Sequence, residues 1–133
     1  MQDYRKLNMW IEAMEYVEGI YNFSVSLAKE ERYGLTDQLK RAAVSIPLNI
    51  AEGAGCRTDP EFERFLWYAY RSVNETTTCL ELTRRLNVSG AKDSEFERLF
   101  DHSDKVSAMI YKFIQKLNDK RFTDDGQRKT DHG

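Results

Sequence analysis

The stretch Tyr33–Gly55, YGLTDQLKRAAVSIPLNIAEGAG, combines small and branched aliphatic residues with a proline in the middle of the run. Pro47 removes one backbone donor from a helix and crowds the preceding turn, at a cost of about 3 kcal/mol in an exposed helix. A helix keeps such a proline only where close packing offsets that cost. We therefore expect a buried helix here, kinked at Pro47, that other helices approach closely.

The same stretch carries an apolar stripe and a polar stripe side by side. The apolar residues recur every three or four positions and so share one helix face: Ala42, Ala43, Ile46, Ile50 and Gly53. Beside them runs a polar set, which two residues of a later helix could face: Arg41, Ser45, Asn49 and Glu52, with Ser72 and Glu75. Buried polar groups need partners. We interpret these six as a structural polar seam that fixes helix register or lines a subunit contact, in preference to a ligand site.

Apolar spacing along the rest of the chain predicts three further helices. The four expected ranges are about 7–29, 36–52, 60–86 and 94–118. Thr36 or Asp37 can cap the second helix, Thr58 or Asp59 the third, and Asp93 or Ser94 the fourth. Short connections favour antiparallel neighbours, so residues 1–118 predict an all-α, antiparallel up-down-up-down four-helix bundle. Residues 119–133 are polar, and we expect them to form a mobile tail.

Each expected helix has a face that should be buried. In the first helix the apolar spacing selects Trp10, Ala13, Met14, Val17, Ile20, Tyr21 and Val25, opposite a solvated acidic face of Glu12, Glu15 and Glu18. In the third it selects Phe62, Leu66, Ala69, Val73, Thr76, Leu80 and Thr83, and in the fourth Phe96, Leu99, Phe100, Ser103, Val106, Ile110, Phe113 and Leu117. These side chains make up the predicted core.

Composition narrows the class of protein. The chain has 133 residues, enough for one domain, and 41% of them are hydrophobic, which predicts a folded protein. No apolar run reaches the roughly 18 residues that cross a bilayer, so we expect a cytoplasmic protein with no membrane partner. The net charge is −2. Without a global basic excess, a nucleic-acid surface would have to be a local patch made by folding or assembly.

Reactive groups are sparse and scattered. The two histidines, His102 and His132, lie outside any Glu-x-x-His motif, so a di-iron centre is not expected. Cys56 and Cys79 lie 23 residues apart, without metal-site or redox spacing, and we expect both to be reduced. Gly53 to Gly55 lack the lysine of a phosphate-binding loop. The sequence thus predicts no catalytic, cofactor-binding or metal-binding residues and indicates a protein that is not an enzyme.

The run QLKRAAVSIPLNIAEG, with Trp10 and Tyr21 before it and FERFLWYA after it, resembles the four-helix bundle family encoded by intervening sequences of bacterial 23S rRNA genes. The accessory variability proteins of diversity-generating retroelements belong to the same wider group. The resemblance extends from about Leu7 to Leu117. It implies a bundle that assembles into a ring, commonly a pentamer, with no assigned catalytic residues and no molecular task for most members.

Two functions stay open at this point. The first is a non-catalytic, ring-forming bundle that acts as an interaction or assembly module, a homo-oligomer whose precise role is unknown. The alternative is an accessory factor that binds RNA or a nucleic-acid-processing protein, as the resemblance to the retroelement proteins implies. Its possible RNA contacts are Lys40, Arg41, Arg57, Arg64, Arg71, Arg84 and Arg85. Acidic residues are interleaved with these, which favours an ion-paired, solvated surface.

Overall fold

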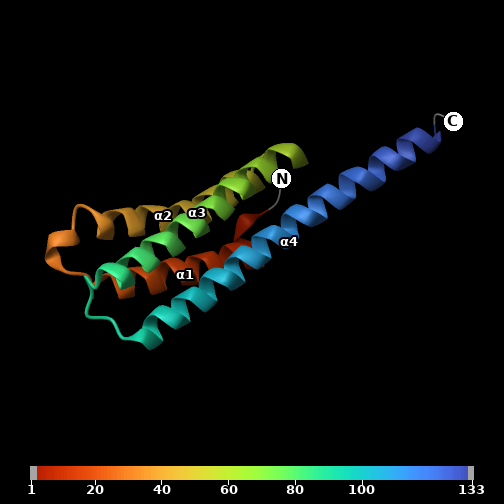
Figure 1. The fold of residues 1–133 in the computed structure, drawn as a ribbon. Coiled ribbons are helices and arrows are strands. Elements are labelled where there is room, and N and C mark those ends of the chain that lie inside the picture. The colour runs from red at the N-terminus through yellow and green to blue at the C-terminus, as the bar shows by residue number, and fades with distance from the viewer. Residues whose placement is uncertain (1–2, 132–133) are drawn as a thin grey trace.

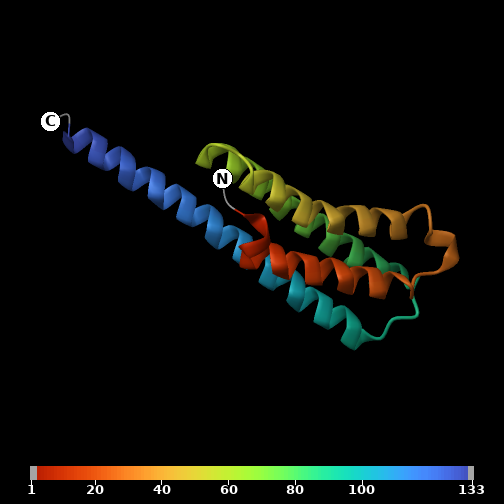
Figure 2. The same cartoon turned by 180° about the vertical axis from the view of Figure 1, so that it is seen from behind.

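The computed structural model describes residues 3–131, with side chains as far as Arg121. Four helices, α1 (Asn8–Ser24), α2 (Leu35–Ala54), α3 (Asp59–Leu86) and α4 (Asp93–Asp131), are joined by short connections. Two 3-10 turns, η1 (Tyr4–Lys6) and η2 (Lys29–Glu31), precede α1 and α2. Each helix packs against the next in the chain, and α1 packs against α4 (Figures 1 and 2). The predicted all-α up-down four-helix bundle is confirmed, and α1 and α3 lie diagonally across it.

The α2–α3 pair is the most closely packed part of the bundle. A Cβ atom built on Gly53 would lie 2.8 Å from Cδ1 of Phe62 and 3.0 Å from Cβ of Phe65, so only glycine fits between these backbones. The small residues Ala42 and Ala43 are buried on the same helix. α2 runs as one helix through Pro47, which is itself buried. The stretch that singles out this helix in the sequence therefore occupies the tightest helix contact.

The predicted inner faces of α3 and of most of α4 are confirmed. All seven expected α3 residues are buried, and Cys79 and Ser72 are buried beside them. On α4, Phe96, Leu99, Ser103, Val106, Ile110 and Leu117 are buried. Phe100 and Phe113 are only half-buried, because they pack at the edge of the core, whereas Ile114 is buried and was not predicted.

The predicted inner face of α1 is wrong in part. The buried residues are Met9, Ala13, Tyr16, Ile20, Phe23 and Ser24. Met14 and Tyr21 are 40% and 42% exposed, and Val25 is 86% exposed. The helix also ends at Ser24 rather than near residue 29, because the chain turns there and pairs with the α3–α4 loop: Ala28 N donates to Val88 O, and Gly90 N donates to Ser26 O, both at 2.8 Å.

The helix starts differ from the sequence expectation in two of three cases. Thr58 caps α3 as expected, since its hydroxyl accepts a hydrogen bond from the Glu61 amide at 3.3 Å. At α2, Gly34 takes the cap position without a side-chain bond, and Thr36 and Asp37 lie inside the helix. At α4, the first backbone bonds go to the Lys92 carbonyl instead of to a side chain of Asp93 or Ser94.

The end of α4 corrects the expectation of a tail that begins at residue 119. The helix continues to Asp131, past the ends of the other three (Figure 1). Two contacts with α3 favour the continuation: Arg121 pairs with Glu63 at 2.7 Å, and Lys120 lies 3.8 Å from Asp59. Residues 132–133 of the expected tail lie outside the described residues. Across the described part of the chain, no helix is both long and apolar enough to cross a bilayer.

Candidate functional site

The centre of the predicted polar seam is a hydroxyl and amide cluster between α2 and α3. Ser72 Oγ donates to Ser45 Oγ at 2.9 Å, which links the two helices, and Asn49 Nδ2 bonds to the same oxygen at 2.9 Å. Asn49 Nδ2 also donates to the Ser45 carbonyl at 2.8 Å, and Ser72 Oγ lies 3.0 Å from the Tyr68 carbonyl. Because the polar groups of this cluster are hydrogen-bonded to one another, the cluster holds the two helices together and leaves few donors or acceptors free to bind a ligand.

The structure leaves the other three seam residues apart from this cluster. Arg41 is exposed and pairs with Asp37 on its own helix at 3.1 Å. The Glu52 side chain is exposed. Glu75 accepts a hydrogen bond from Gln38, a residue that the seam prediction left out. Gln38 and Glu75 therefore form a second α2–α3 link at the surface, while Arg41 and Glu52 face solvent.

A charged cluster that the sequence analysis did not predict joins α1 to α4. Glu12 lies 2.8 Å from His102 Nε2 through one carboxylate oxygen and 2.8 Å from Lys105 Nζ through the other. The bond from Lys105, followed by that from His102, holds the pKa of Glu12 below its ordinary value. The same contact raises the pKa of Lys105. Residues 12 and 102 are far apart in sequence, so only the helix pairing reveals this contact.

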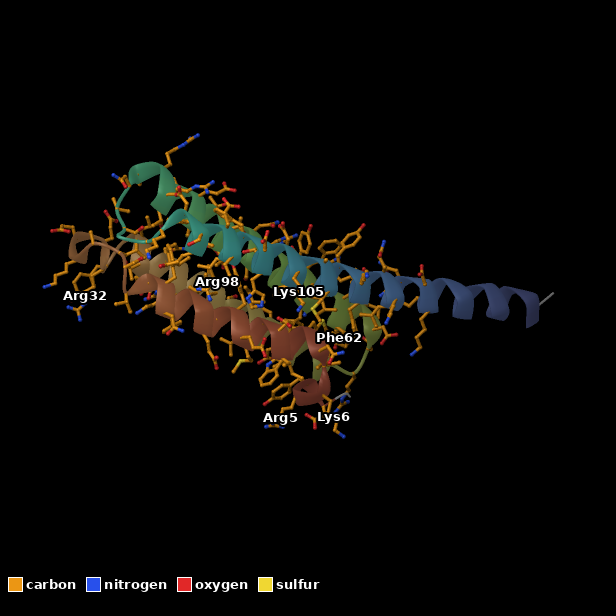
Figure 3. All side chains as sticks on the ribbon, turned by 90° about the horizontal axis from the view of Figure 1, so that it is seen from below. Arg5, Lys6, Arg32, Phe62, Arg98 and Lys105 are labelled. Atoms are coloured by element: carbon orange, nitrogen blue, oxygen red, sulfur yellow. The ribbon has the colours of Figure 1, made fainter. Side chains whose placement is uncertain are left out.

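The cluster has donors of the kind that bind metals, but its charge balance opposes a cation. Glu15 joins Glu12 and His102 in a group whose ligand atoms all lie within 4.8 Å of one another. One Glu12 oxygen is already paired with the Lys105 ammonium, and Arg98 lines the same shallow hollow. Figure 3 shows Lys105 and Arg98 on the side of α4 that runs along α1. A metal cation bound here would have to displace the Lys105 ammonium, and the positive charge of the Arg98 guanidinium would repel it. The arrangement fits an ion-paired buttress between two helices.

Beneath this cluster, Tyr16 and Ser103 form a buried contact. The two hydroxyl oxygens lie 2.5 Å apart, and Ser103 Oγ is also 2.9 Å from the Leu99 carbonyl. Burial raises the pKa of Tyr16 to about 12, against bonds to Ser103 and Thr77 that lower it. A neutral phenol with satisfied bonds and no exposure to solvent is a structural group. The spacing of α1 alone did not predict it.

Neither cysteine is arranged as a nucleophile. Cys79 is buried, and burial, with a smaller effect from Glu75, raises the pKa of its thiol. Burial and nearby Glu61 likewise raise the pKa of the Cys56 thiol, although Arg64 opposes them. Because the thiolate is the reactive form, both shifts lower reactivity at neutral pH.

The possible RNA contacts fall into two groups. Four have a partner: Lys40 lies over the Tyr21 ring at 4.9 Å, Arg41 pairs with Asp37, Arg84 pairs with Glu97 at 3.0 Å, and Arg64 lies over the Phe65 ring at 5.3 Å. Arg64 is exposed, as are the three that have no such partner among the described residues: Arg57, Arg71 and Arg85. Among the described residues, no carboxylate lies within ion-pairing distance of these four exposed arginines. Three of these four lie along α3, and Arg57 lies just before that helix.

Exposed side chains repeat along the outer surface of α3 at steps of four and three. We call this set the outer stripe of α3: Arg64, Tyr68, Arg71, Glu75, Thr78, Leu82 and Arg85. Tyr68 is 39% exposed and Leu82 is 42% exposed. Beside Leu82 and Arg85 the surface is hollowed, with a volume of about 590 Å³. The stripe is therefore basic, partly apolar and concave at its carboxyl end.

A matching set lies on the outer surface of α1. We call it the outer stripe of α1: Ile11, Met14, Glu18, Tyr21 and Val25, at steps of three and four. Ile11 is 41% exposed, close to the value for Met14 and Tyr21. Glu15 is exposed beside it, and neither acid has an ion pair with a described residue. α1 thus carries two apolar stripes, one in the core and one in solvent.

The comparisons with known proteins agree with this architecture. A family model described as 23S rRNA-intervening sequence protein matches residues 5–112. No curated protein matches the chain. Among solved structures, the chain is similar to a protein of unknown function from the S23 ribosomal protein family of Bacteroides thetaiotaomicron, with 23% identity and a TM-score of 0.72. That match covers 80% of this chain and 97% of the other.

Proposed function

The chain belongs to the 23S rRNA-intervening sequence protein family, and from this premise we propose that it is a non-catalytic assembly module whose copies form a closed ring. The family itself carries no specific role. The pentameric state and the relationship to retroelement accessory proteins, both implied by the sequence resemblance, are parts of the proposal.

The outer stripe of α1 carries the proposal. Large apolar side chains at heptad-like spacing are the pattern by which one helix packs on another. In the single chain, however, Ile11, Met14 and Tyr21 stay about 40% exposed. Clustered exposed apolar groups on a folded protein mark interaction sites more often than scattered ones do. A second copy that covers this stripe would bury them.

The interior supports the non-catalytic part of the proposal. The α2–α3 hydroxyls bond to one another, the Tyr16 phenol bonds to Ser103, and both thiols have raised pKa values. A catalysed reaction needs a nucleophile or general base that has a pKa near neutrality and is free to contact the substrate. The polar groups described above are used for packing.

Light-scattering mass across a dilution series tests the proposal. We expect a mass that is a whole multiple, three or greater, of 15.6 kDa and that holds constant over a wide concentration range. A single-chain mass at every concentration up to the solubility limit would overturn it. The absorbance ratio at 260 and 280 nm, measured on the same peak, reports any nucleic acid that travels with the protein.

A second candidate, an RNA-binding or ribonucleoprotein accessory factor, is favoured by one observation. Arg64, Arg71 and Arg85 lie on one exposed side of α3 without described acidic partners, and in a ring such tracks would be repeated once per copy. Phosphate contacts of this kind make affinity fall steeply with salt. Binding of labelled RNA at 50 mM salt that is lost by 200 mM would support this function, and no binding at 50 mM would remove it.

A further inference from the structure

We infer that a surface hollow, formed by η1, the start of α1 and α4, binds a small organic anion that carries a carboxylate or phosphate group on an apolar body. The hollow has a volume of about 340 Å³, and three lysines line it: Lys6, Lys112 and Lys116. The lining residues belong to one chain, so this inference does not depend on the proposed ring.

The three lysines of the hollow have no acidic partners. Among the described residues, no carboxylate lies within ion-pairing distance of their ammonium groups, and no acid lines the hollow. The acids that flank η1 are paired with other cations: Asp3 lies 3.7 Å from Arg5, and Glu12 lies 2.8 Å from Lys105. Asp119 follows the last of the three lysines on α4 but does not line the hollow. Although the whole chain has a net charge of −2, the hollow is therefore positive.

The spacing of the lysines concentrates this charge. Lys112 and Lys116 lie four residues apart on α4, and like charges at that spacing destabilise a helix. Lys6 reaches the same hollow from the η1 turn (Figure 3). Ammonium groups that share one hollow repel each other, and a bound anion would offset that repulsion. Departures of this kind from local rules are expected at functional sites.

The first turn of α1 adds to the positive charge. The helix begins at Asn8, which lines the hollow, and its cap residue Leu7 makes no side-chain hydrogen bond. The first turn contains no acid. Backbone amides at the start of a helix carry partial positive charge. These amides support a site that the three lysines define.

The rest of the hollow is mostly apolar, and its apolar lining consists of Leu7, Met9, Met109 and Phe113. Met9 is buried, and the other three are only partly buried where they pack against the core. Small-molecule sites are mostly apolar with a few polar groups and range from about 300 to 1,000 Å³, so this hollow suits a small ligand. Inorganic phosphate would leave the apolar lining uncovered, and a hydrocarbon would leave the lysines unpaired. A ligand that has both an anionic head and an apolar body matches both parts.

Isothermal titration calorimetry on the wild-type chain tests the ligand chemistry. The probes are octanoate, octyl phosphate, octanol and acetate. We expect at least one of the two anionic octyl compounds to bind about tenfold more tightly than octanol, which lacks the charge, and acetate, which lacks the apolar body. The tighter of the two identifies the head group. Equal affinity for octanol and for both octyl anions, or no binding of either anion, would overturn the inference.

Replacement of the lysines tests the location of the site. Lys6→Gln with Lys112→Gln and Lys116→Gln should weaken binding of the tighter octyl anion by about tenfold, while circular dichroism shows the variant folded. If the triple variant does not fold, Lys112→Glu alone should weaken binding in the same direction, since this side chain is exposed. Unchanged affinity in a folded lysine variant would overturn the site.

The matched control removes the same charge from other exposed positions. Arg57→Gln with Arg71→Gln and Arg85→Gln should change the Kd of the octyl anion by less than about twofold. Equal weakening in the lysine and arginine variants would mean that the anion responds to overall charge, and the site would be overturned. Labelled RNA that binds the wild type and is lost in the lysine variant, with octyl-anion binding unchanged, would assign these lysines to RNA and likewise overturn the inference.

Discussion

The α2–α3 contact is built from small residues and internal hydrogen bonds, whereas the outer stripe of α1 is built from large apolar residues and acids. Between α2 and α3, glycine and alanine let the backbones come close, and Ser45, Asn49 and Ser72 bond to each other. On the outside of α1, large apolar side chains face solvent together with Glu15 and Glu18, which have no ion pair with a described residue. The α2–α3 contact is satisfied within a single chain, whereas the α1 stripe stays exposed in it. The most distinctive stretch of the sequence therefore encodes architecture, and the interaction surface that we propose lies on another helix.

The largest expected effect comes from breaking the close approach at Gly53. Gly53→Val should lower the free energy of unfolding by about 3 kcal/mol, because the new side chain would overlap Phe62 and Phe65. Urea denaturation measures this. Gly55→Val is the matched control, since a Cβ there meets its nearest neighbour at 3.6 Å, and it should cost less than about 1 kcal/mol. Equal losses of unfolding free energy in the two variants would contradict the claim that α2 and α3 approach too closely at Gly53 for a larger side chain.

The two sides of α1 can be separated by removing one hydroxyl from each. Tyr16→Phe loses a buried bond to Ser103 and should destabilise the chain by about 1 kcal/mol, whereas Tyr21→Phe should have an effect within about 0.5 kcal/mol. The pKa of about 12 for folded Tyr16 exceeds its ordinary value of 10. Ionisation in the unfolded state should therefore reduce wild-type stability as pH rises from 10 to 12. Tyr16→Phe should lack this part of the alkaline loss, and an identical alkaline profile in the two proteins would contradict the assignment.

A smaller effect should follow from the hydroxyl link between α2 and α3. Ser72→Ala removes the donor to Ser45 and should cost about 0.5 to 1 kcal/mol, because Asn49 still bonds to Ser45. Thr78→Ala is the control, since its hydroxyl bonds only within α3 on the exposed side. Thermal unfolding compares the two. A greater loss in the control would mean that the link does not tie the helices together.

The smallest effect concerns the ion-paired cluster between α1 and α4. The pKa of Glu12 is lowered in the folded state, so its pairing stabilises the fold above the ordinary carboxyl pKa and is lost as pH falls through the lowered value. Glu12→Gln should cost under about 1 kcal/mol at pH 7 and nearly nothing at pH 2. Glu18→Gln, without a described ion pair, should show no such pH-dependent difference. A Glu12→Gln deficit that persists unchanged at pH 2 would rule out the charge pairing as its cause.

Local patterns were enough to predict the bundle and the inner face of α3. Seven α3 residues alternate at steps of four and three, and the second α3 stripe with that spacing is mostly charged or polar, so composition shows which of the two faces the core. On α1 the pattern misled because two apolar stripes share one helix. Met14, Tyr21 and Val25 fit a helical period, but the period does not say which stripe faces the core. The exposed placement of these three residues is the feature that the sequence could not provide.

Contacts between distant segments account for the rest. The sequence indicates that Ser72 can face the polar stripe of α2 if α2 and α3 are adjacent, and in the structure Ser72 does bond to Ser45. The Glu12–His102 and Tyr16–Ser103 contacts join residues 90 and 87 positions apart and depend on the register of α1 against α4. Likewise α4 extends beyond the expected end because Arg121 reaches Glu63. Periodicity on one helix carries no information about such register.

The most direct test of the account is the mass of a variant whose α1 stripe has lost its apolar side chains. Ile11→Gln with Met14→Gln and Tyr21→Gln removes the three large side chains that stay about 40% exposed in the single chain. This variant should have the mass of one chain, 15.6 kDa, while circular dichroism shows it folded, and the wild type should have a whole multiple of that mass. A folded variant that keeps the wild-type mass, or a wild type with the single-chain mass, would contradict the account.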